Sequence, residues 1–236
     1  MKNKVLLVAP TSNELLGVKN VMTKINRKIV DDILVVDLNS NDGTVEFCKK
    51  HGFKVHHQKT KGYGAAMMEA LELNNNEIIV EFPPDGSSPP ERIVDLIKKI
   101  EDGYDFVIAS RYMKGAKSYD DDIITGFGNF MFTKIVNTLF GTQYTDVLIG
   151  FRAYRRSVLD KVNIQAKSLD WSVELPILMS KFGAKITEIP CDEPKRIGGK
   201  RKMHPIKTGL EISRVIIWQF FHPHSYLKSK DHIRVH

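Results

Sequence analysis

An acidic turn around Asp85 carries the first candidate for chemistry. Asp85 follows the apolar run 77–82, which is typical of a buried strand, and Pro83 and Pro84 end that run because proline cannot donate to a sheet ladder. Residues 90–100 then place apolar side chains at helical spacing. In open α/β sheets, ligands bind beyond the carboxyl ends of strands. Asp85 is therefore a candidate ligand-binding carboxylate, although an ordinary Asp-Gly turn explains the pattern equally well on its own.

Polar residues also follow two earlier strand-like runs. Asn13 and Glu14 come after the run 4–9, where they either face a ligand or begin the next helix. Asp37 ends the run 33–37, and a carboxylate at that point can accept hydrogen bonds from a base or a ribose. Clusters of this kind are also typical of any βα turn, so each motif alone is weak evidence for a site.

A glycine-bearing turn, Lys61-Gly62-Tyr63-Gly64, precedes a helix-like segment. The glycines allow close backbone approach, and a helix N-terminus favours an anion. The turn lacks the Gly-Lys-Ser/Thr ending of a P-loop, and it does not follow the first strand as a dinucleotide fingerprint does. It is therefore a candidate anion-binding turn that belongs neither to the P-loops nor to the dinucleotide-binding turns.

Several basic side chains are candidate phosphate ligands, because a guanidinium group binds phosphate as a fork. Arg111 follows the run 106–109, and Arg152 lies in a second arginine-bearing stretch. Residues 195–202 carry five positive charges and can stabilise a departing diphosphate. The candidates in that stretch are Arg196, Lys200 and Lys202. Solvated arginines and a basic surface loop or membrane-surface patch remain the alternatives.

Asp170 and Glu174 are four residues apart on a predicted helix and therefore share one face. Such a pair can serve acid–base chemistry or orient an acceptor hydroxyl. The alternative is a helix start whose acidic residues complement the helix dipole.

The elements that must position these residues alternate between strand and helix, which predicts an α/β fold with a mostly parallel sheet. The expected strands are 4–9, 33–37, 54–57, 77–82, 106–109, 147–154 and 185–190. The expected helices are 14–26, 44–51, 65–73, 90–100, 123–140, 172–182 and 205–221. No linker interrupts them, so we expect one domain over 1–221, ending in an amphipathic helix, and a polar tail over 222–236.

Composition narrows the class of protein further. The chain has 236 residues, 42% of them hydrophobic, and a formal net charge of +7, which indicates an anionic partner. Its basic stretch lacks interleaved aromatic residues, so we do not expect nucleic acid. The two cysteines form neither a disulfide framework nor a metal motif, which favours a reducing compartment. We expect no membrane-spanning helix, because no uninterrupted apolar run reaches about 18 residues.

Taken in order from about residue 5 to about residue 204, these motifs resemble those of the family-2 glycosyltransferases of GT-A fold. The resemblance is greatest to the polyprenyl-phosphate (dolichol-phosphate mannose synthase-like) sugar transferases. The matching segments are 10–14 (Pro-x-x-Asn-Glu), 37–44, 61–65, Asp85 with 89–91, 110–112, Asp146 with 150–152, and Arg196 with the basic residues after it.

The resemblance implies a Rossmann-like three-layer α/β/α sandwich with a mixed, mostly parallel sheet. It implies inverting transfer of a sugar from a UDP- or GDP-sugar to a polyprenyl phosphate or a saccharide, at the inner face of a membrane or in the cytoplasm. The nucleotide-binding residues would be Pro10, Thr11, Asn13, Glu14, Asp37, Asn39, Lys61, Gly62, Gly64, Pro84, Asp85 and Arg111. The catalytic residues would be Asp85, Arg111, Asp170 and Glu174. The residues near phosphate would be Arg152, Arg196, Lys200 and Lys202.

Asp85 would also bind Mg²⁺ or Mn²⁺ on the diphosphate, since both ions prefer oxygen ligands. An acceptor phosphate is already anionic, whereas a sugar hydroxyl would need Asp170 or Glu174 as a base.

The chain departs from the family pattern at three positions. Pro83 replaces the first Asp of the Asp-x-Asp metal motif, Leu38 replaces the second Asp of an Asp-Asp pair, and Ser87 stands where Gln is frequent. The metal site is then weaker, recruits Glu81 or water, or is dispensable.

A sugar nucleotidyltransferase and a non-catalytic nucleotide-sugar-binding protein are the alternative functions. The apolar segment 210–221 suits either an interfacial helix or packing against the core or a sister subunit.

Overall fold

A seven-stranded sheet in the order β3-β2-β1-β4-β6-β5-β7 forms the centre of the computed structural model, which describes residues 3–198 and 203–228. The strands are β1 (Val5–Thr11), β2 (Asp32–Asp37), β3 (Lys54–His57), β4 (Ile78–Glu81), β5 (Phe106–Ser110), β6 (Arg152–Arg155) and β7 (Ile186–Pro190). Only β6 runs antiparallel to its neighbours, so the predicted mixed, mostly parallel sheet is confirmed.

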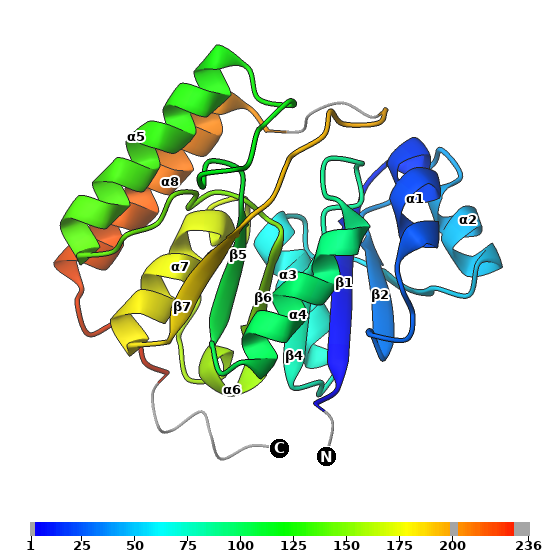
Figure 1. The fold of residues 1–236 in the computed structure, drawn as a ribbon, viewed down its shortest axis with the longest axis horizontal. Coiled ribbons are helices and arrows are strands. Elements are labelled where there is room, and N and C mark those ends of the chain that lie inside the picture. Colours follow the sequence, from blue (N-terminus) through cyan, green and yellow to red (C-terminus); the bar gives the residue numbers. More distant parts are fainter. Residues whose placement is uncertain (1–2, 199–202, 229–236) are drawn as a thin grey trace.

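Helices cover both faces of this sheet (Figure 1). They are α1 (Leu15–Val21), α2 (Thr44–Lys50), α3 (Tyr63–Glu72), α4 (Ile93–Glu101), α5 (Ile123–Phe140), α6 (Arg156–Leu159), α7 (Trp171–Phe182) and α8 (Pro205–Phe221), with 3₁₀ turns η1 (Met22–Lys24) and η2 (Pro90–Arg92). Helix α4 lies on one face, whereas α3 and α7 contact each other on the opposite face. The three-layer α/β/α arrangement is therefore confirmed.

The central strands are buried on both faces, which explains why they are continuous apolar runs rather than alternating ones. All residues of β4 and β5 are buried, as are Val5 to Ala9 of β1. Because β1, β2 and β4 are parallel, their carboxyl ends meet at one edge of the sheet. That edge carries Thr11, Asp37 and the turn at Asp85.

The expected strand 147–154 is shorter in the structure. Strand β6 begins at Arg152, and residues 147–151 are irregular. The reason is local: the buried Arg152 side chain donates hydrogen bonds to the carbonyl oxygens of Val147 and Ile149. These bonds fold the preceding segment back on Arg152 instead of extending it along the sheet.

Helices α5 and α8 pack side by side at one end of the molecule (Figure 1). The rings of Phe140 and Phe220 meet edge to face, with their centroids 6.5 Å apart. The described part of the tail is docked, since the backbone N–H of Asn163 donates to the Tyr226 carbonyl oxygen at 2.8 Å. Over residues 3–198 and 203–228, no helix combines the length and the apolar character needed to cross a bilayer.

Candidate active site

The first two βα turns are joined by hydrogen bonds at the edge of the sheet. The Thr11 hydroxyl donates to Asp37 Oδ1 at 2.9 Å, and the backbone N–H of Ser40 donates to Asp37 Oδ2 at 2.9 Å. Asn13 has φ 55° and Asn39 has φ 50°, a left-handed conformation that asparagine adopts more readily than most residues. The expected residues Thr11, Asn13, Asp37 and Asn39 are therefore brought together, with Pro10 at the end of the same strand.

Asp85 lies beside this group in a tightly enclosed turn. Its Oδ1 accepts hydrogen bonds from the backbone N–H of Ser87 at 2.9 Å and from the Ser87 hydroxyl at 2.7 Å. Its Oδ2 lies 2.7 Å from Arg196 Nη2, and Arg196 Nη1 lies 3.5 Å from Glu14 Oε1. Two carboxylates thus flank one cationic group at this end of the site.

Helix α1 packs directly on the turn that holds Asp85. A Cβ atom added to Gly17 would lie 2.5 Å from the Pro84 carbonyl oxygen and 2.7 Å from Asp85 Cα. Only glycine allows this approach, so α1 and the Asp85 turn hold each other in place.

A cavity of about 580 Å³ opens from Asp85 toward α5 and α8. Its polar end is lined by Asp85, Ser87, Arg111, Asp120, Asp121, Glu193 and Arg196. Its apolar end is lined mainly by Ile124, Phe127, Met131, Phe132, Ile206, Leu210 and Ile212, from the two paired helices. The cavity thus joins a charged end to an apolar end, which suits a ligand with a charged head and a hydrocarbon tail.

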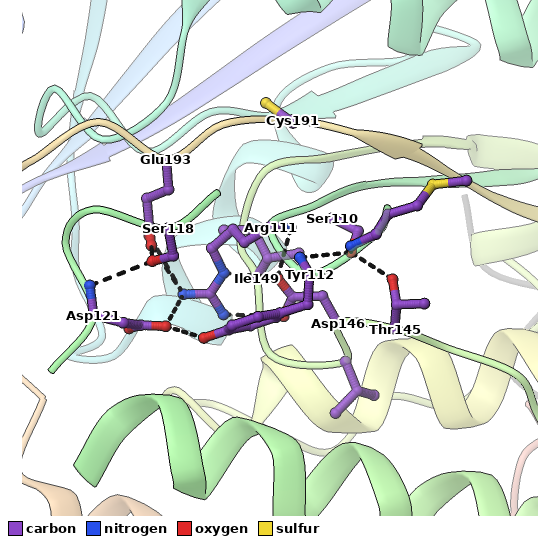
Figure 2. Close-up of polar contacts among 12 residues, drawn as sticks. Ser110, Arg111, Tyr112, Ser118, Asp121, Thr145, Asp146, Ile149, Cys191 and Glu193 are labelled. Atoms are coloured by element: carbon purple, nitrogen blue, oxygen red, sulfur yellow. Dashed lines mark hydrogen bonds and ion pairs between the residues drawn. The ribbon is translucent and has the colours of Figure 1, made fainter. Parts of the chain in front are cut away.

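Figure 2 shows the Arg111 guanidinium between Asp146 on one side and Asp121 and Glu193 on the other. Arg111 Nε lies 2.6 Å from Asp146 Oδ2, and Nη2 lies 3.0 Å from Asp146 Oδ1, a bidentate pair with a fully buried carboxylate. Arg111 Nη1 lies 3.3 Å from Glu193 Oε1 and 3.5 Å from Asp121 Oδ2. Arg111 lines the cavity, but three carboxylates surround it.

Burial and charge act against each other in this cluster. Burial lowers the pKa of Arg111, and Asp146 and Glu193 outweigh that effect, so its pKa lies well above its ordinary value. Burial raises the pKa of Glu193, while the Arg111 charge opposes the rise. The cluster keeps Arg111 charged and fixed in position.

Asp121 and Glu193 are site residues that the sequence analysis missed. The signal was the run Tyr119-Asp-Asp-Asp122, which predicts only a surface loop. In the structure its three carboxylates have three different partners: Asp120 accepts from the Arg196 backbone N–H, Asp121 pairs with Arg111, and Asp122 caps α5. The spacing of an acidic run does not reveal which carboxylate meets which partner, least of all a partner such as Arg196, 76 residues from Asp120.

The structure contradicts the phosphate-binding role expected for Arg152. Its side chain is fully buried in β6 and donates to the carbonyl oxygens of Val147, Ile149 and Ser172. Arg152 also lies close enough to the buried Glu81 to affect its pKa, which burial raises above its ordinary value. Glu81 accepts from Trp171 Nε1 at 2.8 Å, so it is a structural carboxylate beneath the cavity and not a recruited metal ligand.

Asp170 and Glu174 do not line the cavity. Asp170 precedes α7 and accepts from the Ser168 backbone N–H at 2.9 Å. Glu174 is 2% exposed, and its Oε2 accepts from the backbone N–H groups of Gln165 and Ala166 at 2.9 and 2.6 Å. Burial raises its pKa. The expected acid–base role therefore fails for Glu174, because both carboxylate oxygens accept hydrogen bonds from other residues of the chain.

The glycine-bearing turn at α3 has a packing role. The backbone N–H of Gly64 donates to the Ser168 carbonyl oxygen, and a Cβ on Gly62 would lie 2.1 Å from the Lys167 carbonyl oxygen. The start of α3 is therefore covered by the chain itself and is not open to an anion. Lys61 is exposed, whereas Lys200 and Lys202 lie outside the described residues.

The described residues contain no cluster of three His, Cys, Asp or Glu side chains arranged to hold a metal ion. Pro83 contributes no ligand atom, so Asp85 is the carboxylate available from the expected motif. An Mg²⁺ or Mn²⁺ ion at Asp85 would need most of its oxygen ligands from a diphosphate and water, which is the usual arrangement for Mg²⁺ in phosphate-transfer sites. Glu14 is a second carboxylate close by, and the Arg196 guanidinium already lies beside both Glu14 and Asp85. The residues present therefore fit a divalent cation at this place.

Comparison with known proteins identifies the family of the chain. The model of the family "Glycosyl transferase family 2" matches residues 7–162. A dolichyl-phosphate hexose transferase of Haloferax volcanii is 31% identical over 214 residues, covering 89% of this chain and 91% of that protein. The polyprenol monophosphomannose synthase of Mycolicibacterium smegmatis is 28% identical and covers 91% of this chain and 86% of that protein.

Among solved structures, glucosyl-3-phosphoglycerate synthase from Mycobacterium tuberculosis, in complex with Mn²⁺, UDP and glucosyl-3-phosphoglycerate, has a TM-score of 0.71. It is 18% identical, and the match covers 97% of this chain and 82% of that one. At this identity the likeness establishes the GT-A type of fold and nothing finer.

Proposed function

This chain belongs to glycosyl transferase family 2, and from that premise we propose that it transfers a hexose from a nucleoside-diphosphate sugar to a polyprenyl phosphate. The reaction inverts the anomeric carbon, because the acceptor oxygen attacks in line as the diphosphate leaves. The observation that carries the proposal is the single cavity whose polar end lies at the sheet edge and whose apolar end lies between α5 and α8.

The polar end and the sheet edge formed by the turns after β1 and β2 supply what the donor needs. Asp37 and Asn13 hold the first two βα turns together, so these turns form a rigid seat for the nucleoside. Arg196 lies beside Asp85, where the donor's diphosphate would bind. A divalent cation, Mg²⁺ or Mn²⁺, would be held by Asp85 and would neutralise negative charge on the leaving diphosphate.

The chemistry at the acceptor end supports a phosphate over a sugar hydroxyl. A polyprenyl phosphate is an anion at neutral pH and needs no general base. Asp170 and Glu174, the two carboxylates expected to act as bases, do not line the cavity. Arg111 and Arg196 are the cations in the described lining of its polar end, and both are paired with carboxylates, so an acceptor phosphate would compete for them.

The outer surfaces of α5 and α8 suit contact with a membrane, from which a polyprenyl chain would enter. The most exposed apolar side chains on this pair are Ile123, Ile124, Phe127 and Phe130 of α5, and Ile206, Leu210, Ile217, Trp218 and Phe221 of α8. Lys207 and Arg214 are exposed on α8 and would attract anionic lipid. This face, called here the α5–α8 face, places the apolar end of the cavity at the lipid surface.

A transfer assay tests the proposal. The protein is incubated with radiolabelled UDP- or GDP-hexoses and a polyprenyl phosphate in vesicles, with Mg²⁺, Mn²⁺ or a chelator. We expect label from one donor to move into the organic-extractable lipid fraction. Absence of transfer from every donor, with each nucleotide still raising the melting temperature, would instead indicate a binding protein without catalysis.

A further inference from the structure

The segment 191–198, called here the strap, follows β7 (Figure 1), and its residues Glu193 and Arg196 line the polar end of the cavity. Backbone hydrogen bonds fix it at several points. The N–H of Glu193 donates to the Lys117 carbonyl oxygen at 2.9 Å, and the N–H of Arg196 donates to Asp120 Oδ1 at 3.0 Å. The N–H of Ile197 donates to the Asp85 carbonyl oxygen at 2.8 Å. The Arg196 side chain therefore starts from a well-determined position beside Asp85.

Two glycines let the strap lie this close. Gly86 has φ +94°, and a Cβ there would lie 2.7 Å from the side chain of Ile197. Gly198 has φ +77°, and a Cβ there would lie 2.7 Å from the side chain of Leu16 in α1. The strap is thus seated on the Asp85 turn and on the first helix at once.

This seating places the Arg196 guanidinium between two carboxylates. Its Nη2 lies 2.7 Å from Asp85 Oδ2, and its Nη1 lies 3.5 Å from Glu14 Oε1. The guanidinium therefore lies within ion-pair distance of two carboxylates, at the end of the cavity where the motif for a divalent cation has lost its first carboxylate to Pro83. A divalent cation at Asp85 would approach to about 2.1 Å and would repel the guanidinium from the same oxygen.

We propose that Arg196 occupies the cation position of the donor-free enzyme and that the divalent cation displaces it from Asp85. The inference rests on the proposed function, because the released guanidinium then has the donor's diphosphate as its new partner. One arginine would thereby couple metal entry to diphosphate binding. Arg196 keeps Asp85 paired when no donor is present, and it is available to the phosphates only once the metal has taken its place.

The test measures binding of Mn²⁺ alone to the donor-free protein, by electron paramagnetic resonance of the free ion. Arg196→Gln removes the competing charge, so we expect Mn²⁺ to bind about tenfold more tightly than to the wild type. Lys195→Gln is the matched control, since it removes the same charge from an exposed neighbour in the strap. The control should change the affinity by less than about twofold.

An unchanged Mn²⁺ affinity in Arg196→Gln would overturn the proposal, and so would an equal gain in Lys195→Gln. Adding Asp85→Asn to Arg196→Gln should abolish the gain, and persistence of the gain would overturn the assignment to Asp85. Arg196→Met is a second neutral variant that keeps the packing of the arginine stem if the glutamine variant fails to fold. The binding measurement contains no sugar donor and no acceptor. Its outcome, competition between Arg196 and Mn²⁺ for Asp85, can therefore be told apart from the outcome of the glycosyl-transfer assay.

Discussion

The two ends of the cavity are built differently. The polar end consists of segments that follow β4, β5 and β7, and contacts such as the Ser87 to Asp85 hydrogen bond and the Arg111–Asp146 ion pair hold it together. The apolar end consists of one face each of α5 and α8, whose outer surfaces stay exposed. The polar end is therefore rigid and can select a ligand by its hydrogen-bonding groups and charges, whereas the apolar end selects only for apolar character.

The difference assigns the two substrates to the two ends. A nucleotide sugar needs hydrogen-bonding groups in fixed positions. The turns after β1 and β2, which hydrogen bonds join at the edge of the sheet, supply them. An isoprenoid chain needs a continuous apolar path, which a helix pair supplies without any particular hydrogen bond. Substitutions at the two ends should therefore damage different measurable properties.

Asp85→Asn should have the largest effect. It keeps the shape of the turn but removes the negative charge that faces the cation and Arg196, so kcat/KM should fall by about 100-fold or more. Steady-state transfer from the radiolabelled donor measures this, and vesicle binding should not change. Asp95→Asn, an equivalent substitution at a half-buried aspartate of α4 that also pairs with an arginine, Arg92, is the control and should transfer at the wild-type rate. Full activity of Asp85→Asn would remove Asp85 from the mechanism.

The double substitution Ile217→Ser and Trp218→Ser tests the other end. Both side chains are more than half exposed on α8, so their loss should leave the fold intact and weaken vesicle binding by about tenfold or more. Cosedimentation with anionic vesicles measures the change, and the affinity for nucleotide should stay the same. Leu73→Ser is the control, because Leu73 is equally exposed at the end of α3. If the α5–α8 face instead joins two copies of the chain, the double variant would change the molar mass in solution and leave vesicle binding unaltered.

Gly86→Ala should have a smaller effect, at the junction between the strap and the polar end. Its positive φ and its contact with Ile197 together predict a loss of about 2 kcal/mol in the free energy of unfolding. Gly115→Ala isolates the contact, because Gly115 also has a positive φ, +99°, but no atom lies within 4 Å of an added Cβ. Urea denaturation of the two variants should show the larger loss for Gly86→Ala, and equal losses would contradict the close packing of the strap.

The sequence predicts the carboxyl-end edge of the sheet, including Asp85 at the polar end of the cavity, far better than the apolar end. Asn13, Asp37 and Asp85 stand in turns where short-range rules apply, so their meeting at one edge follows from a parallel sheet. Arg152 and Glu174 show the limit of those rules. Arg152 donates to the Val147 carbonyl oxygen and Glu174 accepts from the Ala166 N–H, both in irregular segments, and no periodicity in the sequence predicts such contacts.

The apolar end depends on tertiary packing. The apolar residues of α5 predict a helix, but the sequence does not reveal that this helix pairs with α8, which begins 65 residues after α5 ends. Nor does it show which apolar side chains stay exposed, since that depends on which face each helix turns to the sheet. The cavity arises from this pairing and was for that reason absent from the sequence analysis.

Glu174→Gln should have the smallest effect on transfer. It distinguishes a carboxylate that stabilises the fold from one that takes part in catalysis. Burial raises the folded-state pKa of Glu174, so its contribution to stability is fully present below the unfolded-state pKa of about 4.3 and is lost as the pH rises through the folded-state pKa. Glutamine does not ionise, so the stability of the variant relative to the wild type should increase over that window. Urea denaturation between about pH 4 and pH 7 measures it. A large loss of transfer with unchanged stability would instead restore a catalytic role to Glu174.

The most direct test of the central claim is the nucleotide product released from the donor with and without polyprenyl phosphate. If one cavity joins a donor end to a lipid-phosphate end, each lipid-linked sugar formed should release one nucleoside diphosphate, and release should depend on the polyprenyl phosphate. Release of pyrophosphate would identify a nucleotidyltransferase and contradict the account. Nucleoside diphosphate release that does not respond to the polyprenyl phosphate would contradict the assignment of the apolar end.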